Sequence, residues 1–476
     1  MPDVDLFESQ MPVKSKCKFI AFSCSKYGCL IPPITWMDIE YPLRIFAVMK
    51  KSIALILSLV LAFQFAAFAQ TLAPVYFSGA IKEKKIALKK NIVQNTITKN
   101  LSYPLNADTE DYWIDAFWGM ELLRYRSPWA EGRIQLAFDS IENRTAVFQR
   151  ALLELAYTNY PGRFLKQVST MLHKTGNAKV FAMCAEYIRL SGTSPLAAID
   201  PEKIKQQLIK NEKDEAILYS LFCRLQCTDQ QQNKPSLSPV LYPGFLKNQT
   251  ILYSFQRKNR NYPGLAMIRD SAGNFVSDET GHIFSVPQLA RSISNLPGYL
   301  TNGNTPQGIF RMYGFDTSKT TFIGPTTNIQ LTMPFETSLQ HFFNDSTITD
   351  TTWTLEWYKK LLPAKSIIHY QPLYESFYAG KAGRTEIIAH GTTVDPEYYA
   401  GELYYPQTPT MGCLCTKELW SEVDGKRLES DQQKLAAALQ KAGGANGYCV
   451  VIEIDDAQKP VTLPEILPFI KPDNSQ

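Results

Sequence analysis

A histidine and a cysteine in the last quarter of the chain have the residue types and setting of a thiol nucleophile with its base. The apolar run Ile387–Ala389 leads into His390, and a short polar turn leads into Cys413. Each lies beside a glycine, Gly391 or Gly412, and the chain has only 5 histidines. An imidazole can take the thiol's proton and later return it to a leaving amine, and backbone amides at a glycine turn can stabilise an oxyanion. Taken alone, the pair is also consistent with a buried thiol and an unrelated surface imidazole.

The residues around the pair favour the chemical interpretation. His390-Gly391, an eighteen-residue spacer and then Thr410-Met411-Gly412-Cys413 resemble the signature of the L,D-transpeptidase (YkuD) catalytic domain, which is His-Gly, a spacer and Ser/Thr-His-Gly-Cys. Upstream, Asn304–Phe310 is similar to the Thr-Pro-x-Gly-x-Phe element that precedes the active site in this family. The resemblance covers roughly residues 245–456, and its motifs occur in the family's order.

The resemblance implies a role for each of these residues. Cys413 would be the nucleophile and His390 the base, oriented by the carbonyl of Gly391, while the amides of Gly412 and Cys413 would form the oxyanion hole. Thr410 and Met411 are predicted to line the substrate. The implied substrate is the peptidoglycan stem peptide, and the implied products are a 3→3 cross-link or a trimmed stem. No metal or organic cofactor is expected.

The chain departs from the family pattern at three places. Met411 stands where the family usually has histidine, Leu414-Cys415 replaces the usual apolar-Asn/Arg pair, and the spacer is slightly longer than usual. Two alternatives to a transpeptidase are therefore open: an L,D-carboxypeptidase or other exported cysteine amidase, and a catalytically degenerate wall-binding module.

Three further features have more than one interpretation. The tyrosines of the spacer (Tyr398, Tyr399, Tyr404 and Tyr405) could cover an extended peptide or pack on one another, and we include Tyr404 and Tyr405 among the substrate-binding candidates. Cys415 could lie near Cys413 because residues i and i+2 of a strand share a face, but a small packed side chain is the simpler interpretation. Arg311 could meet a substrate carboxylate or form a surface ion pair.

The N-terminus predicts export. Met49-Lys50-Lys51 is a basic start, Ser52–Phe68 is mostly apolar, and Ala67-Phe68-Ala69 is a small-x-small cleavage pattern. We expect residues 49–69 to be a cleaved signal peptide rather than a membrane anchor, residues 1–48 to be a non-native upstream extension, and the mature protein to be periplasmic. An exported protein meets an oxidising compartment, yet Cys223 and Cys227, one helical turn apart, are predicted to be core thiols rather than a disulfide.

The pattern of apolar residues along the chain, together with the family resemblance, predicts an α+β protein. An all-helical N-terminal domain is followed by a mainly β L,D-transpeptidase-like domain. Residues 70–227 are the helical domain, 228–244 the linker and 245–476 the catalytic domain. Apolar residues at helical spacing or in short β-branched runs give the expected elements. The expected helices are 111–123, 144–157, 162–174, 178–190, 201–210, 214–225 and 430–441, and the expected strands are 250–256, 264–269, 308–313, 328–333, 385–389 and 448–453.

The composition excludes one class of partner. The 49 basic and 45 acidic residues give a net charge of +4 and are interspersed, with no basic run suited to nucleic acid. The predicted partners are peptidoglycan stem peptides and, through the helical domain, a wall or envelope component.

Overall fold

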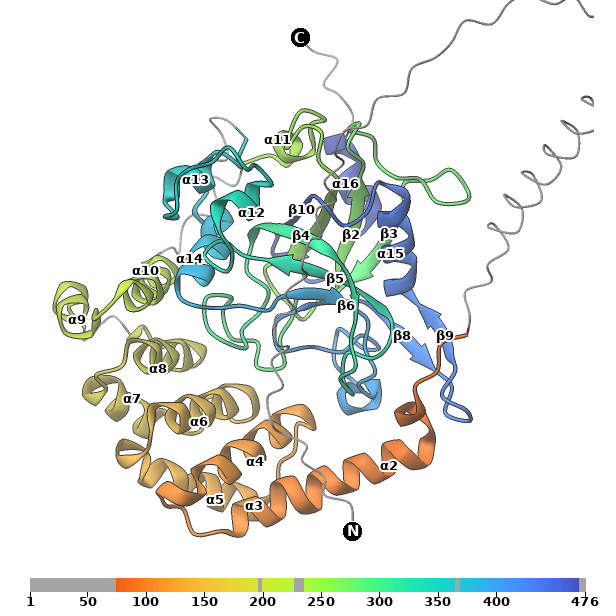
Figure 1. Ribbon diagram of the computed structural model, residues 1–476. Coiled ribbons are helices and arrows are strands. Elements are labelled where there is room, and N and C mark those ends of the chain that lie inside the picture. The colour runs from red at the N-terminus through yellow and green to blue at the C-terminus, as the bar shows by residue number, and fades with distance from the viewer. Residues whose placement is uncertain (1–73, 196–198, 227–234, 364–368, 471–476) are drawn as a thin grey trace, which may run out of the picture. The chain divides into compact units, whose positions relative to one another are not determined.

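Capped amphipathic helices make up the first part of the structure, a computed structural model that describes residues 74–195, 199–226, 235–363 and 369–470 (Figure 1). The expected upstream extension, the signal peptide, Cys227 and residues 228–234 of the linker lie outside these residues. The helices of this first part are α2 (Lys82–Asn91), a π-helical continuation (Ile92–Lys99), α3 (Asn100–Ser102), α4 (Glu110–Leu122), α5 (Pro128–Asp139), α6 (Ala146–Asn159), α7 (Leu165–Lys174), α8 (Ala178–Leu190), α9 (Pro201–Leu208) and α10 (Glu212–Gln226).

Side-chain caps fix where several of these helices begin. The hydroxyl of Thr145 accepts the amide of Phe148 at 3.2 Å, and Asn177 caps α8 in the same way. The bounds expected for α8 from the sequence are confirmed, whereas α2 and α5 were not predicted. The faces that these helices bury, including Trp113, Phe117 and Phe148, form one apolar core.

The second part is built on an eight-stranded mixed sheet in the order β3-β2-β1-β10-β4-β5-β6-β7. Its strands are β1 (Ile251–Arg257), β2 (Gly264–Arg269), β3 (Ser285–Gln288), β4 (Gly308–Thr317), β5 (Thr327–Thr332), β6 (Ile388–His390), β7 (Leu414–Cys415) and β10 (Tyr448–Asp455), and a separate ribbon joins β8 (Glu418–Trp420) to β9 (Arg427–Ser430). Two pairs are parallel, β1 with β10 and β6 with β7. All six predicted strands are present, and the α+β fold class is confirmed.

The two edge strands of this sheet meet. Leu289, directly after β3, and Cys415, in β7, exchange backbone hydrogen bonds of 2.7 and 2.8 Å. Because β3 and β7 are the first and last strands in the order, this bridge closes the sheet on itself.

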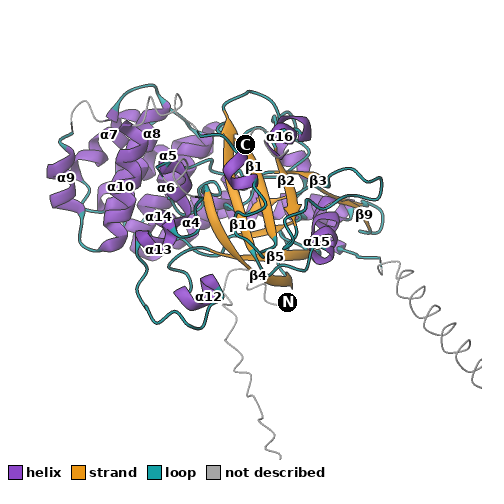
Figure 2. Cartoon of the chain, turned by 90° about the horizontal axis from the view of Figure 1, so that it is seen from above, coloured by secondary structure: helices purple, strands orange, loops and turns teal. Residues whose placement is uncertain are grey.

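Helices cover the sheet, so the description of this part as mainly β was incomplete. Helix α15 (Asp431–Lys441) lies beside the strands in Figures 1 and 2, and its Leu435 and Leu439 share a core with Ala389 of β6 and Leu414 of β7. Other strand residues pack with the remaining helices. These are α11 (Ser238–Leu241), α12 (Leu339–Phe343), α13 (Leu355–Lys359), α14 (Glu375–Lys381) and α16 (Leu463–Ile470).

The helical segments and the strand-bearing segment share buried contacts. Leu296 and Leu300, from the loop between β3 and β4, belong to the core of the helices. The fully buried carboxylate of Glu186 in α8 accepts the hydroxyl of Tyr299 at 3.2 Å and pairs with Arg189 and Arg224. The loop that follows β3 is therefore anchored to the helices.

Candidate active site

The parallel pair β6 and β7 places His390 beside a residue that is two positions in sequence from Cys413. In the register of this pair, Ala389 lies beside Leu414 and His390 beside Cys415. Ala389 and Leu414 are fully buried in the core under α15. Since side chains alternate along a strand, His390 and its neighbour Cys415 both point to the opposite face, and Cys413 directly precedes β7.

His390 is held as a neutral base. Its side chain is 4% exposed, and Nδ1 contacts the carbonyl oxygen of Gly391. A carbonyl can only accept, so Nδ1 carries the proton and Nε2 keeps a free lone pair. Burial lowers the pKa of His390 to about 4, while the Gly391 carbonyl opposes that shift. The imidazole is therefore uncharged at neutral pH and able to accept a proton.

The Cys413 thiol is turned to a backbone carbonyl in this structure. Its Sγ donates to the carbonyl oxygen of Glu386 at 3.7 Å, and this is the hydrogen bond that the structure gives the thiol, rather than one to His390. Burial raises the pKa of Cys413, although the amide of Ile388 and the guanidinium of Arg384 act to lower it. Proton transfer to His390 thus requires the thiol to leave the Glu386 carbonyl.

Two sequence elements predicted separately meet at the turn before Cys413. The hydroxyl of Thr305, from the Thr-Pro-x-Gly element, donates to the carbonyl of Gly412 at 2.8 Å. The hydroxyl of Thr410 accepts the amide of Gly412 and donates to the carbonyl of Cys413, each at 3.0 Å. Gly412 has φ +115°, a conformation that favours glycine.

These hydrogen bonds alter two of the predicted roles. The Gly412 amide, expected in the oxyanion hole, is already bonded to Thr410, so it is not directed at a substrate oxygen in this conformation. Thr410, expected to contact substrate, instead holds the turn. Met411 is 50% exposed beside them and remains accessible to a ligand.

The tyrosines of the spacer divide into two kinds. Tyr404 is fully buried with Tyr399 and Leu289, and its ring lies 4.8 Å from the guanidinium carbon of Arg291. Tyr404 therefore packs inside the protein, and its expected contact with substrate is not compatible with this burial. Tyr405 is 43% exposed, and its hydroxyl donates to Glu397 at 2.7 Å.

The remaining candidates, Cys415 and Arg311, are packed inside the protein. Cys415 and Cys413 are both free thiols, and Cys415 is fully buried, as expected for a packed residue. Arg311 is buried, donates to Asn446 at 2.7 Å and lies over the Tyr448 ring, so neither a surface ion pair nor an exposed carboxylate site describes it. In the described ranges, no group of three or more His, Cys, Asp or Glu residues is placed to hold a metal ion.

Sequence reasoning missed two charged residues beside the pair. Arg384 precedes β6, is 6% exposed, and donates to three backbone carbonyls in the loop after β3. Glu418 of β8 lies against Gly391, because a β-carbon added to Gly391 would fall 2.2 Å from its carboxyl carbon. No local pattern marks either residue, since their partners lie far away in the sequence.

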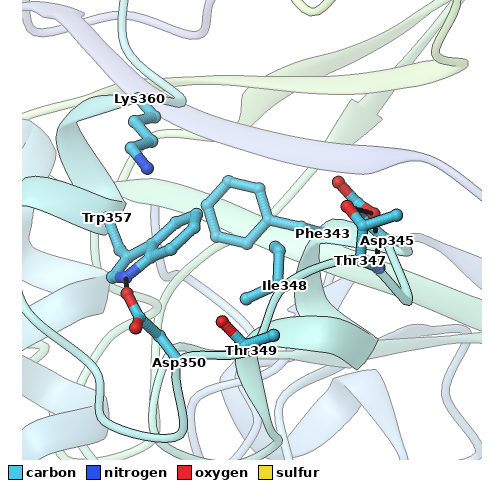
Figure 3. A pocket seen from close by; sticks show the side chains of 8 residues that line it. All are labelled: Phe343, Asp345, Thr347, Ile348, Thr349, Asp350, Trp357 and Lys360. Atoms are coloured by element: carbon cyan, nitrogen blue, oxygen red, sulfur yellow. Dashed lines mark hydrogen bonds between the residues drawn. The ribbon is translucent and has the colours of Figure 1, made fainter.

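A separate hollow of about 550 Å³ lies near α12 and α13 (Figure 3). Trp357 donates to Asp350 at 2.8 Å there, and the Lys360 ammonium sits 3.3 Å from the centre of the Trp357 ring system. The lining residues are Phe343, Asp345, Thr347, Ile348, Thr349, Asp350, Trp357 and Lys360, and none is a residue of the candidate site.

Comparison with known proteins gave no relative: no family model, curated protein or solved structure matches the chain. In the part of the chain that the structure describes, no helix has the length and apolar character needed to cross a membrane.

Proposed function

We propose that this chain is an exported, cysteine-dependent peptidoglycan L,D-transpeptidase. The observation that supports the proposal is the pairing of β6 with β7, which puts His390 beside Cys415, two residues after Cys413, with the histidine tautomer fixed by Gly391. The motif resemblance adds the substrate class. We further infer that residues 70–227 form a helical domain, that residues 245–476 form the catalytic domain, and that a signal peptide at 49–69 delivers the protein to the periplasm.

In the proposed reaction, His390 Nε2 takes the proton of Cys413, and Sγ attacks the carbonyl carbon of the third, diamino residue of a stem peptide. The bond from that carbonyl to the terminal D-alanine nitrogen breaks, His390 returns the proton to the leaving amine, and a thioester remains. An amine of a second stem peptide then attacks the thioester, giving a 3→3 cross-link and the free thiol.

Labelling with a carbapenem tests the thioester directly. We expect the purified chain to gain the mass of one carbapenem, the Cys413→Ala variant to gain none, and the Cys449→Ala variant to label like wild type. Cys449 is a suitable control because it is a fully buried free thiol in β10. Equal labelling of wild type and Cys413→Ala, or none of either, would refute the proposal.

One observation favours a second candidate, the degenerate wall-binding module. The thiol is bonded to Glu386 rather than His390, and burial raises its pKa. A module of this kind would sediment with purified peptidoglycan without acquiring a carbapenem. Products separate the transpeptidase from a carboxypeptidase, because only the transpeptidase raises the fraction of cross-linked muropeptides while D-alanine is released.

A further inference from the structure

Arg384 is a buried cation with no ion-pair partner among the described residues. Its side chain is 6% exposed, and among the described residues no carboxylate oxygen lies within 4.0 Å of its guanidinium. A buried charge is costly unless other groups compensate it. Backbone carbonyls compensate the charge of Arg384. Its Nη1 donates to the carbonyl of Gly298 and, at 2.6 Å, to that of Asn304, and its Nη2 donates to the carbonyl of Gly303 at 2.5 Å.

The same guanidinium packs against the turn that carries the nucleophile. A β-carbon on Gly412 would lie 1.9 Å from Nη2 of Arg384 and 2.5 Å from the carbonyl oxygen of Gly303. Arg384 therefore touches the backbone one residue before Cys413. Arg384 binds the loop of residues 298–304, which leads directly into Thr305. The hydroxyl of Thr305 donates a hydrogen bond to the Gly412 carbonyl.

Among the described residues, Arg384 is the cation whose charge acts on the Cys413 thiol. Burial lowers the pKa of His390 to about 4, so the imidazole is neutral at pH 7. Burial raises the pKa of Glu375 and Glu154, the two carboxyls whose charges act on Arg384. The Glu386 carboxylate opposes ionisation of the thiol, and Arg384 favours it.

We propose that Arg384 is a positioning residue for Cys413: it fixes the Gly412 turn and its charge stabilises the Cys413 thiolate. When the S–H bond breaks, the proton passes to His390 Nε2 or to solvent, and the negative charge stays on Sγ beside the guanidinium. The inference rests on the proposed use of Cys413 as a nucleophile. It differs from a thiolate held by an imidazolium, because the compensating charge is permanent.

The test measures the pKa of the Cys413 thiol in the full chain from the pH dependence of its alkylation by iodoacetamide, located by peptide mass. We expect Arg384→Gln to raise that pKa by about one unit, which slows alkylation at pH 7 about tenfold. Arg384→Lys keeps the positive charge but loses the bidentate hydrogen-bonding geometry of the guanidinium. The pKa of Cys413 in this variant should therefore lie between its values in wild type and in Arg384→Gln.

Arg269→Gln is the matched control. Arg269 is 1% exposed and donates to the carbonyls of Tyr242 and Phe245, so its loss costs similar buried hydrogen bonds elsewhere in the sheet. We expect it to leave the pKa of Cys413 within 0.2 units, roughly the reproducibility of such titrations when the local environment is unchanged. An equal shift in both variants, or none in a folded Arg384→Gln variant, would overturn the inference.

His390→Gln keeps the inference testable if Arg384→Gln does not fold. Because the cation, Arg384, is still present in this variant, alkylation of Cys413 should follow a single titration step with a nearly unchanged pKa. A rise of one unit or more would assign the thiolate to an imidazolium and reject Arg384. Neither titration requires turnover. If the pKa of Cys413 shifts as expected but no carbapenem labels the protein, the proposed function is refuted and the role of Arg384 stands.

Discussion

The Nη2 atom of Arg384 occupies the space that a β-carbon on Gly412 would need, 1.9 Å from its ideal position. A residue on the approach to β6 thus decides which residue can precede the cysteine at β7. The contact joins two segments whose sequence patterns show no connection, and it explains why glycine is required at 412 beyond its φ of +115°.

Replacing that glycine should therefore cost more than backbone strain. We expect Gly412→Ala to lower the free energy of unfolding by about 3 kcal/mol, from a strained φ and a displaced guanidinium, and to abolish carbapenem labelling. Gly281→Ala is the control, because Gly281 has φ +83° and no atom within 4 Å of its ideal β-carbon. Urea unfolding should give it a loss of only about 1 kcal/mol. Similar losses in the two variants would contradict the steric role of Arg384.

The hydroxyl of Thr305 should matter for both stability and reactivity. Thr305→Val leaves the buried Gly412 carbonyl without its donor, so we expect a loss of about 1–2 kcal/mol and slower labelling of Cys413. The control is Thr250→Val, which removes a buried hydroxyl bonded to the Ala442 carbonyl at 3.1 Å. Chemical unfolding should show comparable losses, whereas only the Thr305 variant should label slowly; unchanged labelling would argue against coupling between the two sequence elements.

Glu418 should make the protein less stable as the pH rises. Burial raises the pKa of Glu418 to about 7, against 4.5 for an exposed glutamate. A carboxyl with a raised folded pKa contributes stability that is fully present below pH 4.5 and is lost as the pH rises through 7. Glu418→Gln should remove about 3 kcal/mol of this pH dependence, since each pKa unit corresponds to about 1.4 kcal/mol. Parallel stability curves for the two proteins between pH 4.5 and 8 would contradict this expectation.

His390 should set an unusually acidic limit on acylation. Because burial lowers its pKa to about 4, the imidazole stays a base until the pH falls through 4 rather than through 6.5. The rate of carbapenem acylation should therefore stay nearly constant from pH 8 to 5. By linkage, the depressed pKa contributes stability above pH 6.5 that is lost as the pH falls through 4, so folding must be monitored alongside. An acid limb centred near 6.5 would show that the imidazole is solvated during the reaction.

Regular elements could be predicted because their signals are local. The apolar run Gly264–Arg269 gave β2 with its observed bounds, and the helical spacing of Ala178–Leu190 did the same for α8. Strand β7 has only two residues, too few for an alternating pattern, and it forms through pairing with β6. Short strands of this kind depend on tertiary contacts.

The site was predicted only as far as its motifs reach. His390, Gly391 and Cys413 carry a sequence pattern, whereas Arg384 binds carbonyls 80–86 positions away and leaves no trace in its own neighbourhood. For the same reason the sequence left open whether Tyr404 packs inside the protein or meets substrate. Its burial depends on Leu289, which spacing within the tyrosine loop cannot reveal.

The bridge between Leu289 and Cys415 makes the surroundings of Cys413 depend on closure of the sheet. Cys413 stands two residues before the bridge that joins the first and last strands, so its surroundings form only after chain segments 126 residues apart have met. On the proposed function, acyl transfer would therefore require this closure of the sheet.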